Sequence, residues 1–82
     1  MRMYGIKSSN IASIGWENDQ EAGHGVARVQ FVKGDIYEYY PIPYKMWEEL
    51  WEQPSNQRSK WIMENLIRNK KISYEKLDQD NG

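Results

Sequence analysis

The sequence predicts an α+β domain in which a three-stranded antiparallel β-meander is followed by two α-helices packed on one face of the sheet. Apolar and polar residues alternate in three runs before residue 41, which is the period of half-buried strands. Beyond Pro43 the apolar residues recur at helical spacing instead. With 82 residues there is room for one domain. We therefore expect a single domain over residues 1–82, ordered from about residue 4 to 77, with a frayed tail at 78–82.

The first expected strand spans residues 11–16, with Ile14 and Trp16 on one face and Ile11 on the other. The polar, glycine-bearing stretch 17–25 that follows is typical of a connecting loop.

The second expected strand spans residues 26–32 and the third spans 35–40. Gly34 lies between them, where a tight hairpin needs a positive φ. Tyr37 and Tyr39 share one face of the third strand, and we expect the helices to cover that face.

The first helix is expected over residues 44–53, preceded by Pro41 and Pro43 and ended by Pro54. Its apolar stripe consists of Met46, Trp47, Leu50 and Trp51. The second helix is expected to begin at a cap formed by Ser55 or Ser59 and to run to about residue 69. Its apolar stripe consists of Ile62, Met63, Leu66 and Ile67.

After the helices, residues 72–74 are apolar enough to pack across the sheet or to add a short strand, and Leu77 is placed to close the core.

Composition excludes several classes of protein. The chain has no cysteine, so disulfide scaffolds and thiolate metal sites are ruled out. It has no apolar run of about 18 residues and no apolar segment at its start, so we expect a cytoplasmic protein without a membrane partner. The net charge is −1, but residues 58–71 carry five basic side chains against one acidic side chain, Glu64. This basic segment is a candidate surface for a partner.

The order of several motifs resembles the KTSC domain family, which is named for its occurrence at the carboxy terminus of some lysyl-tRNA synthetases. The resemblance rests on residues 8–16, on the pattern Phe31-x-x-Gly34-x-x-Tyr37-x-Tyr39-x-x-Ile42-Pro43, on Ile67-Arg68 and on residues 74–77. It covers the chain from about residue 7 to 77. It implies a domain that often stands alone in phages and prophages, and no catalytic residue can be carried over.

The chain departs from the family pattern at two places. Trp16 stands where the family usually has tyrosine, and residues 55–59 lack the glycine of a Ser-x-Gly pair that usually opens the second helix. No function that the family performs through that glycine is carried over.

Catalytic, metal and cofactor sites are not expected. His24 is the only histidine and lies in the expected loop, where exposure to solvent is the simpler interpretation than a role as general base. The helical carboxylates Glu48, Glu49 and Glu52 have the oxygens that a hard cation needs, but we expect them to form the solvated face of the first helix.

The second helix carries the main candidate binding site. Arg58, Trp61, Asn65 and Arg68 follow one another at helical spacing, beside the apolar stripe. An indole between two guanidinium groups suits a ligand with a flat ring and phosphates. The alternative is that Trp61 packs in the core and that the cations near the helix end stabilise its dipole.

Two further candidates lie on the sheet. Ser8, Ser9 and Asn10 offer hydroxyl, amide and backbone groups to a ligand, or else they cap a turn within the fold. Tyr37 and Tyr39 have the rings to stack on bases, although packing in the core is the favoured interpretation.

The leading hypothesis is a non-catalytic binding protein, phage-encoded, that sequesters a phosphate-bearing nucleotide or a host nucleotide signal. Its pocket would lie at the interface of a homo-oligomer, for which Tyr40, Trp47 and Trp51 are the candidate interface residues. One alternative is an RNA-binding accessory module that uses the basic segment. Another is an inhibitor that docks on a host protein through aromatic anchors.

Overall fold

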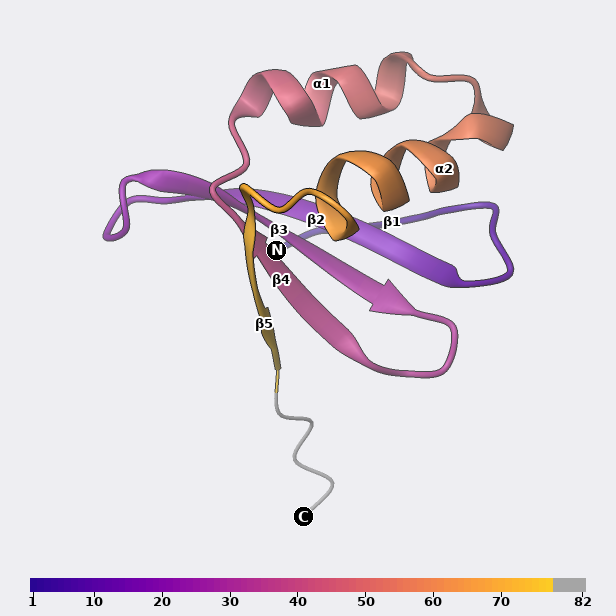
Figure 1. Ribbon diagram of the computed structural model, residues 1–82, viewed down its shortest axis with the longest axis horizontal. Coiled ribbons are helices and arrows are strands. Elements are labelled where there is room, and N and C mark those ends of the chain that lie inside the picture. The colour runs from indigo at the N-terminus through magenta and orange to yellow at the C-terminus, as the bar shows by residue number, and fades with distance from the viewer. Residues whose placement is uncertain (78–82) are drawn as a thin grey trace.

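The computed structural model describes residues 1–77 and shows an antiparallel sheet with both helices on one side of it (Figure 1). The five strands lie in the sheet in their order along the chain. They are β1 (Met3–Gly5), β2 (Ile11–Asp19), β3 (His24–Phe31), β4 (Ile36–Tyr40) and β5 (Ser73–Lys76). The α+β class and the antiparallel meander are confirmed, but the expected number of three strands is wrong.

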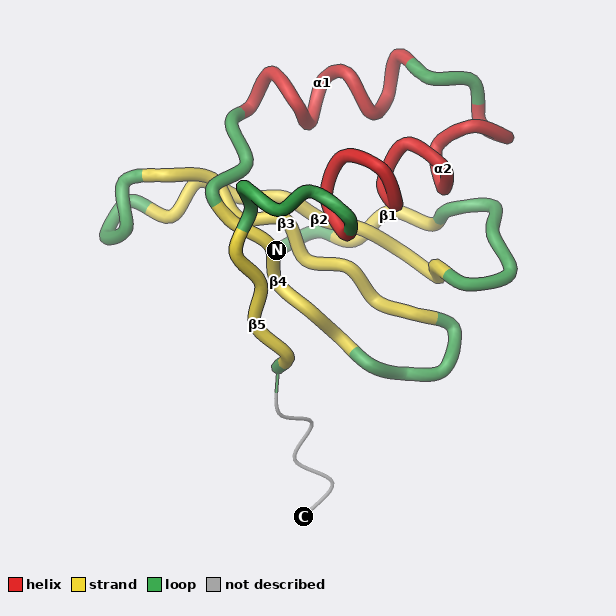
Figure 2. Tube along the Cα trace, in the orientation of Figure 1, coloured by secondary structure: helices red, strands yellow, loops and turns green. Residues whose placement is uncertain are grey.

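The helical segment connects β4 to β5 and crosses one face of the sheet (Figure 2). It consists of α1 (Tyr44–Glu52), a 3₁₀ turn η1 (Ser55–Gln57), α2 (Arg58–Ile62) and a π-helical turn η2 (Met63–Ile67). Prolines separate these elements as expected, since β4 ends before Pro41 and α1 ends before Pro54. Neither Ser55 nor Ser59 caps the second helix with its side chain, so that expectation is wrong.

Strand β1 was missed because three residues are too few to show an alternating pattern. It pairs with β2 through Tyr4 opposite Ile14 and Met3 opposite Gly15. Gly15 allows this close approach, since a Cβ there would lie only 2.5 Å from the carbonyl oxygen of Arg2. The short strand is therefore held by its neighbour rather than by its own sequence.

A bulge in β2 changes which residues face the core. The register against β3 shifts between Ile11 and Ser13, so Ala12 is an extra residue on β2. Ile11 and Ile14 were expected on opposite faces, but both are buried in the core. Because of the bulge, Ile11 and Ile14 lie on the same face of the sheet although they are three residues apart.

The core lies between the helices and one face of the sheet. Its buried members are Ile11, Ile14, Ala27, Val29, Tyr39, Ile42, Leu50, Ile62 and Leu66. The apolar stripes expected for both helices contribute to it. Tyr39 also lies in the core, on the face of the sheet where it was expected. The opposite face is more polar, although Val26 also lies on it, and there Arg28 donates two hydrogen bonds to Glu38 at 3.0 and 2.7 Å. This separation of faces explains the alternation in the sequence.

The ends of the expected elements are also adjusted. The polar stretch after Trp16 belongs partly to the sheet, because β2 and β3 extend into a long hairpin that projects from it (Figure 1). Gly34 has the positive φ expected in the turn between β3 and β4, at 108°. The last strand begins at Ser73, close to the short strand considered at 72–74, and Leu77 is half-buried. The tail expected at 78–82 lies outside the described residues.

Candidate functional site

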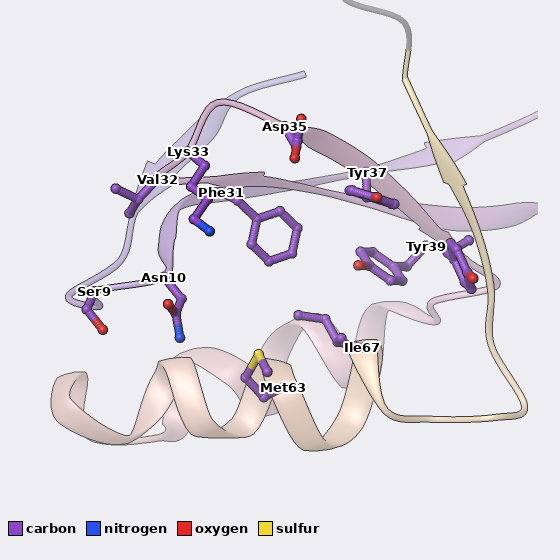
Figure 3. Close-up of a pocket in the computed structure, with 11 residues that line it drawn as sticks. Ser9, Asn10, Phe31, Val32, Lys33, Asp35, Tyr37, Tyr39, Met63 and Ile67 are labelled. Atoms are coloured by element: carbon purple, nitrogen blue, oxygen red, sulfur yellow. The ribbon is translucent and has the colours of Figure 1, made fainter.

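A groove of about 690 Å³ opens between the sheet and the second helical segment (Figure 3). We call it the tyrosine groove. It is lined by Ser9, Asn10, Phe31, Val32, Lys33, Asp35, Tyr37, Tyr39, Met63, Ile67 and Tyr74. The volume is within the range of small-molecule sites, about 300–1,000 Å³. The groove is therefore large enough for a ligand of nucleotide size.

Aromatic rings from three neighbouring strands form the sheet wall of the groove. Tyr37 and Tyr39 share a face of β4 because they are two residues apart, and Tyr39 is opposite Tyr74 of β5. The ring centroids of Tyr37 and Tyr39 are 6.4 Å apart, and Tyr74 lies 6.1 and 6.3 Å from them. Phe31 meets Tyr37 edge-on at 5.8 Å. These rings give the groove flat apolar surfaces.

The hydroxyl of Tyr39 remains a hydrogen-bond donor well into the alkaline range. Burial, together with the nearby Tyr37 and Tyr74, raises the pKa of Tyr39 to about 12. Within residues 1–77 this hydroxyl makes no hydrogen bond; Tyr39 as a whole is only 4% exposed, but its oxygen is not fully enclosed. A ligand in the groove can supply an acceptor for it.

The polar rim comes from the β1–β2 loop and from the β3–β4 hairpin. Ser9 and Asn10 line the groove, whereas Ser8 serves the fold. The Ser8 hydroxyl oxygen accepts hydrogen bonds from the backbone amides of Asn10 and Ile11, both at 3.0 Å, and from the hydroxyl of Ser59 at 2.8 Å. The expected polar cluster is thus divided between a structural residue and two groove residues.

Two side chains of opposite charge flank the hairpin turn at this rim. Figure 3 shows the Lys33 side chain extending from the hairpin toward Phe31 and Asn10. Lys33 forms no ion pair with any residue in the described part of the chain. Asp35 has a partner, the Lys76 ammonium group at 3.6 Å, and both of these side chains are more than half exposed. Lys33 is therefore the groove's available cation.

The helical wall is a π-helical turn. Met63 and Ile67 are its first and last residues, and both line the groove. The Arg68 amide donates to the Met63 carbonyl at 2.9 Å, which is the i to i+5 bond of a π turn. Such turns are frequent at functional sites. Sequence spacing did not identify this wall, because Met63 and Ile67 were expected only in the core.

The residues expected to bind ligand on the second helix do not form a cradle. Arg58 lies over the ring of Trp51 at 4.9 Å and donates to the carbonyl oxygens of Gln53 and Trp51, at 3.0 and 3.3 Å. Asn65 donates to the carbonyl of Trp61 at 2.9 Å. Trp61 is half-buried and packs against the core.

None of these residues lines the tyrosine groove, and neither does the exposed Arg68. Of the expected ligand-binding residues, only Ser9 and Asn10 do so.

The protein-family comparison matches the chain to the KTSC domain over residues 7–58, which is 52 of the 82 residues. The chain belongs to the KTSC domain family. No curated protein matches it. Within this KTSC domain the matched region includes the groove residues from Ser9 to Tyr39. The helical wall and Tyr74 lie beyond the matched region, so this part of the groove is described by the structure alone.

The other candidate residues of the KTSC domain have defined contacts. His24 was expected in an exposed loop, but it is the half-buried first residue of β3 and stacks on Tyr40 with centroids 5.5 Å apart. His24 also lines a second hollow, of about 610 Å³, together with Trp16 and Tyr44. The expected exposed loop position of His24 is wrong because the β2–β3 hairpin extends the sheet and includes His24 in β3.

The two remaining interface candidates pack with the N-terminal strand. Trp47 and Trp51 of α1 have centroids 5.1 Å apart, and Tyr4 of β1 lies 6.0 and 5.6 Å from them. We call these three residues the α1 aromatic cluster. Both indoles are half-buried within one chain.

The described residues include no group of three or more His, Asp or Glu side chains placed to hold a metal ion. Glu48 and Glu52 are exposed and Glu49 is half-buried. Among residues 1–77 there is also no helix with the length and apolar character that crossing a membrane requires.

Proposed function

We propose that this KTSC domain is a non-catalytic binding protein that holds a phosphate-bearing nucleotide in the tyrosine groove. The observation that carries the proposal is the combination of stacked tyrosine rings with one ammonium group, that of Lys33, which has no ion-pair partner among residues 1–77. The site differs from the one that the sequence favoured, because it uses the sheet and the π turn instead of the stripe from Arg58 to Arg68.

The base of the nucleotide occupies the aromatic part of the groove. Base-on-aromatic stacking contributes about 1–3 kcal/mol per base. Tyr74 is 67% exposed, so its ring has free surface to offer. Met63 and Ile67 supply apolar contacts from the opposite wall. The protonated Tyr39 hydroxyl can donate to a carbonyl or ring nitrogen of the base.

The phosphate lies at the rim of the groove, near Lys33. An ammonium group is a compact donor of charge-assisted hydrogen bonds to phosphate oxygens. Ser9 and Asn10 lie at the same rim and add hydroxyl and amide donors.

The residues that line the groove are consistent with binding a ligand without converting it chemically. The described lining residues include no histidine, and their one carboxylate, Asp35, is paired with Lys76. A domain of this kind acts stoichiometrically, so the proposal includes sequestration of a host nucleotide signal by a phage-encoded protein. Assembly into a homo-oligomer is part of the same proposal and predicts a size-exclusion elution volume smaller than that of a monomer.

Calorimetric titration with nucleosides and nucleotides tests the proposal. Tyr74→Ala removes an exposed groove ring and is expected to weaken binding about ten-fold. The matched control is Tyr44→Ala, which removes a tyrosine that is 56% exposed and lies outside the groove. The control is expected to bind as the unaltered protein does.

The outcomes separate the competing functions. No heat with any nucleoside or nucleotide would overturn the proposal. Binding only to RNA, with affinity that falls steeply with salt and upon neutralising Arg68 or Lys70, would favour an RNA-binding module instead. Equal losses for Tyr74→Ala and Tyr44→Ala would remove the groove from the account.

A further inference from the structure

The charges around the tyrosine groove set a limit on the ligand. Among residues 1–77 Lys33 is its unpaired cation, and Asp35 is placed two residues further along the same hairpin. Asp35 is paired with Lys76, so the net positive charge at the rim is that of Lys33. One anionic group can be accommodated near Lys33, but a second one finds no uncompensated cation.

We infer that the groove selects a ligand with a single phosphate group, such as a nucleoside monophosphate, over nucleoside polyphosphates and nucleic acid strands. This inference rests on the proposed function and names its ligand class. The other exposed basic side chains of residues 58–71 do not line the groove; they are Lys60, Arg68, Lys70 and Lys71. They offer no cation to further phosphates of a ligand held among the tyrosines.

Asp35 is paired with the Lys76 ammonium group, so the two add no net charge at the rim. Their charged atoms are 3.6 Å apart and the side chains are 53% and 57% exposed, which is the geometry of a weak surface pair. Lys76 lies opposite Tyr37 in the sheet register, on the face that carries the groove, but it is not among the lining residues. A second phosphate beside Lys33 therefore gains no uncompensated positive charge.

The same arrangement of charges disfavours binding of a nucleic acid strand. Sites for single-stranded nucleic acid combine aromatic platforms with a positively charged track for successive phosphates. Here the aromatic platform is present, but the rim supplies one cation and one anion. A strand would leave its flanking phosphates without cations from the groove.

The test is a titration of one nucleoside and its mono-, di- and triphosphates, without divalent metal, for each of the four common bases. The monophosphate is expected to bind about ten-fold more tightly than the nucleoside, because it gains a charge-assisted contact. The di- and triphosphates are expected to bind more weakly than the monophosphate, because each further phosphate loses hydration without gaining a cation.

Variants identify the groups responsible. Lys33→Gln is expected to remove the gain from the first phosphate while leaving nucleoside affinity unchanged, and Lys60→Gln is the control that retains the gain. Asp35→Asn is expected to increase the affinity for the diphosphate relative to the monophosphate. Both Lys33 and Lys60 are exposed, so neither change should unfold the domain.

The results distinguish this inference from the function on which it rests. A diphosphate affinity equal to or higher than that of the monophosphate, or a gain that survives Lys33→Gln, would overturn the inference and leave nucleotide binding in place. Absence of binding for the whole series would overturn the proposed function itself.

Discussion

The α1 aromatic cluster and the tyrosine groove contain the same kind of residue but use it differently. In the cluster, the faces and edges of Tyr4, Trp47 and Trp51 are occupied by one another and by the Arg58 guanidinium group. In the groove, the rings of Tyr37, Tyr39 and Tyr74 surround a hollow of about 690 Å³. A high aromatic content therefore stabilises the fold in one region and offers a binding surface in the other.

The comparison also explains the roles of the cations. Arg58 is fixed by two backbone carbonyls and an indole, so its charge stabilises the junction between α1 and α2. Lys33 has no ion-pair partner in residues 1–77 and remains available at the groove rim. Variants in the cluster should then affect stability, and variants in the groove should affect binding.

The largest effect is expected for Trp51→Ala. This change removes the ring that contacts Tyr4, Trp47 and Arg58, and truncation of a packed tryptophan costs about 3 kcal/mol of unfolding free energy. Urea denaturation followed by circular dichroism measures it. Nucleotide affinity of the folded variant should be unchanged. A loss of binding without a loss of stability would make Trp51 a ligand contact and would break the division between the two regions.

Arg58→Ala is expected to have the next largest effect, about 2 kcal/mol of unfolding free energy, because hydrogen bonds to α1 and a cation–π contact are lost. Calorimetric titration of the same variant should give the nucleotide affinity of the unaltered protein. If stability were retained and affinity fell ten-fold, the stripe from Arg58 to Arg68 would be the site after all.

The smallest effect is expected for the contribution of Tyr39 to the unfolding free energy of the protein at alkaline pH. Its folded pKa of about 12 is above the ordinary tyrosine value of 10.0, so the folded state holds this proton more tightly than the unfolded state. The stability that Tyr39 contributes is complete below pH 10 and is lost as the pH rises toward 12.

Comparing the unfolding free energy at pH 8 and pH 11 measures this loss. The decrease should be smaller by about 1 kcal/mol in Tyr39→Phe, which has no proton to release. An equal decrease in both proteins would mean that burial does not shift this phenol.

Much of the fold could be predicted from the sequence because strong local patterns determine it. The alternation around Val29 and Tyr39 and the helical stripe around Leu50 each match buried residues of the core. The bulge at Ala12 and the short strand β1 could not be predicted from local patterns. The bulge depends on the pairing of β2 with β3, and β1 depends on its pairing with β2.

The candidate site was predicted only in part. Ser9 and Asn10 were identified from their polarity, and the rings of Tyr37 and Tyr39 were considered for stacking. Helical spacing placed Arg58 beside Trp61 but gave no information on its contact with Trp51, which depends on the turn between the helices. Lys33 and Tyr74 line the same groove because the sheet and the hairpin bring distant parts of the chain together, a long-range arrangement that single-sequence patterns do not contain.

Backbone amide NMR during titration with a nucleoside monophosphate tests the central claim most directly. The account predicts the largest shift changes at Asn10, Lys33, Tyr37, Ile67 and Tyr74, with little change around Trp47 and Trp51. Shift changes concentrated at Arg58, Trp61 and Arg68, or none anywhere at millimolar ligand, would contradict it.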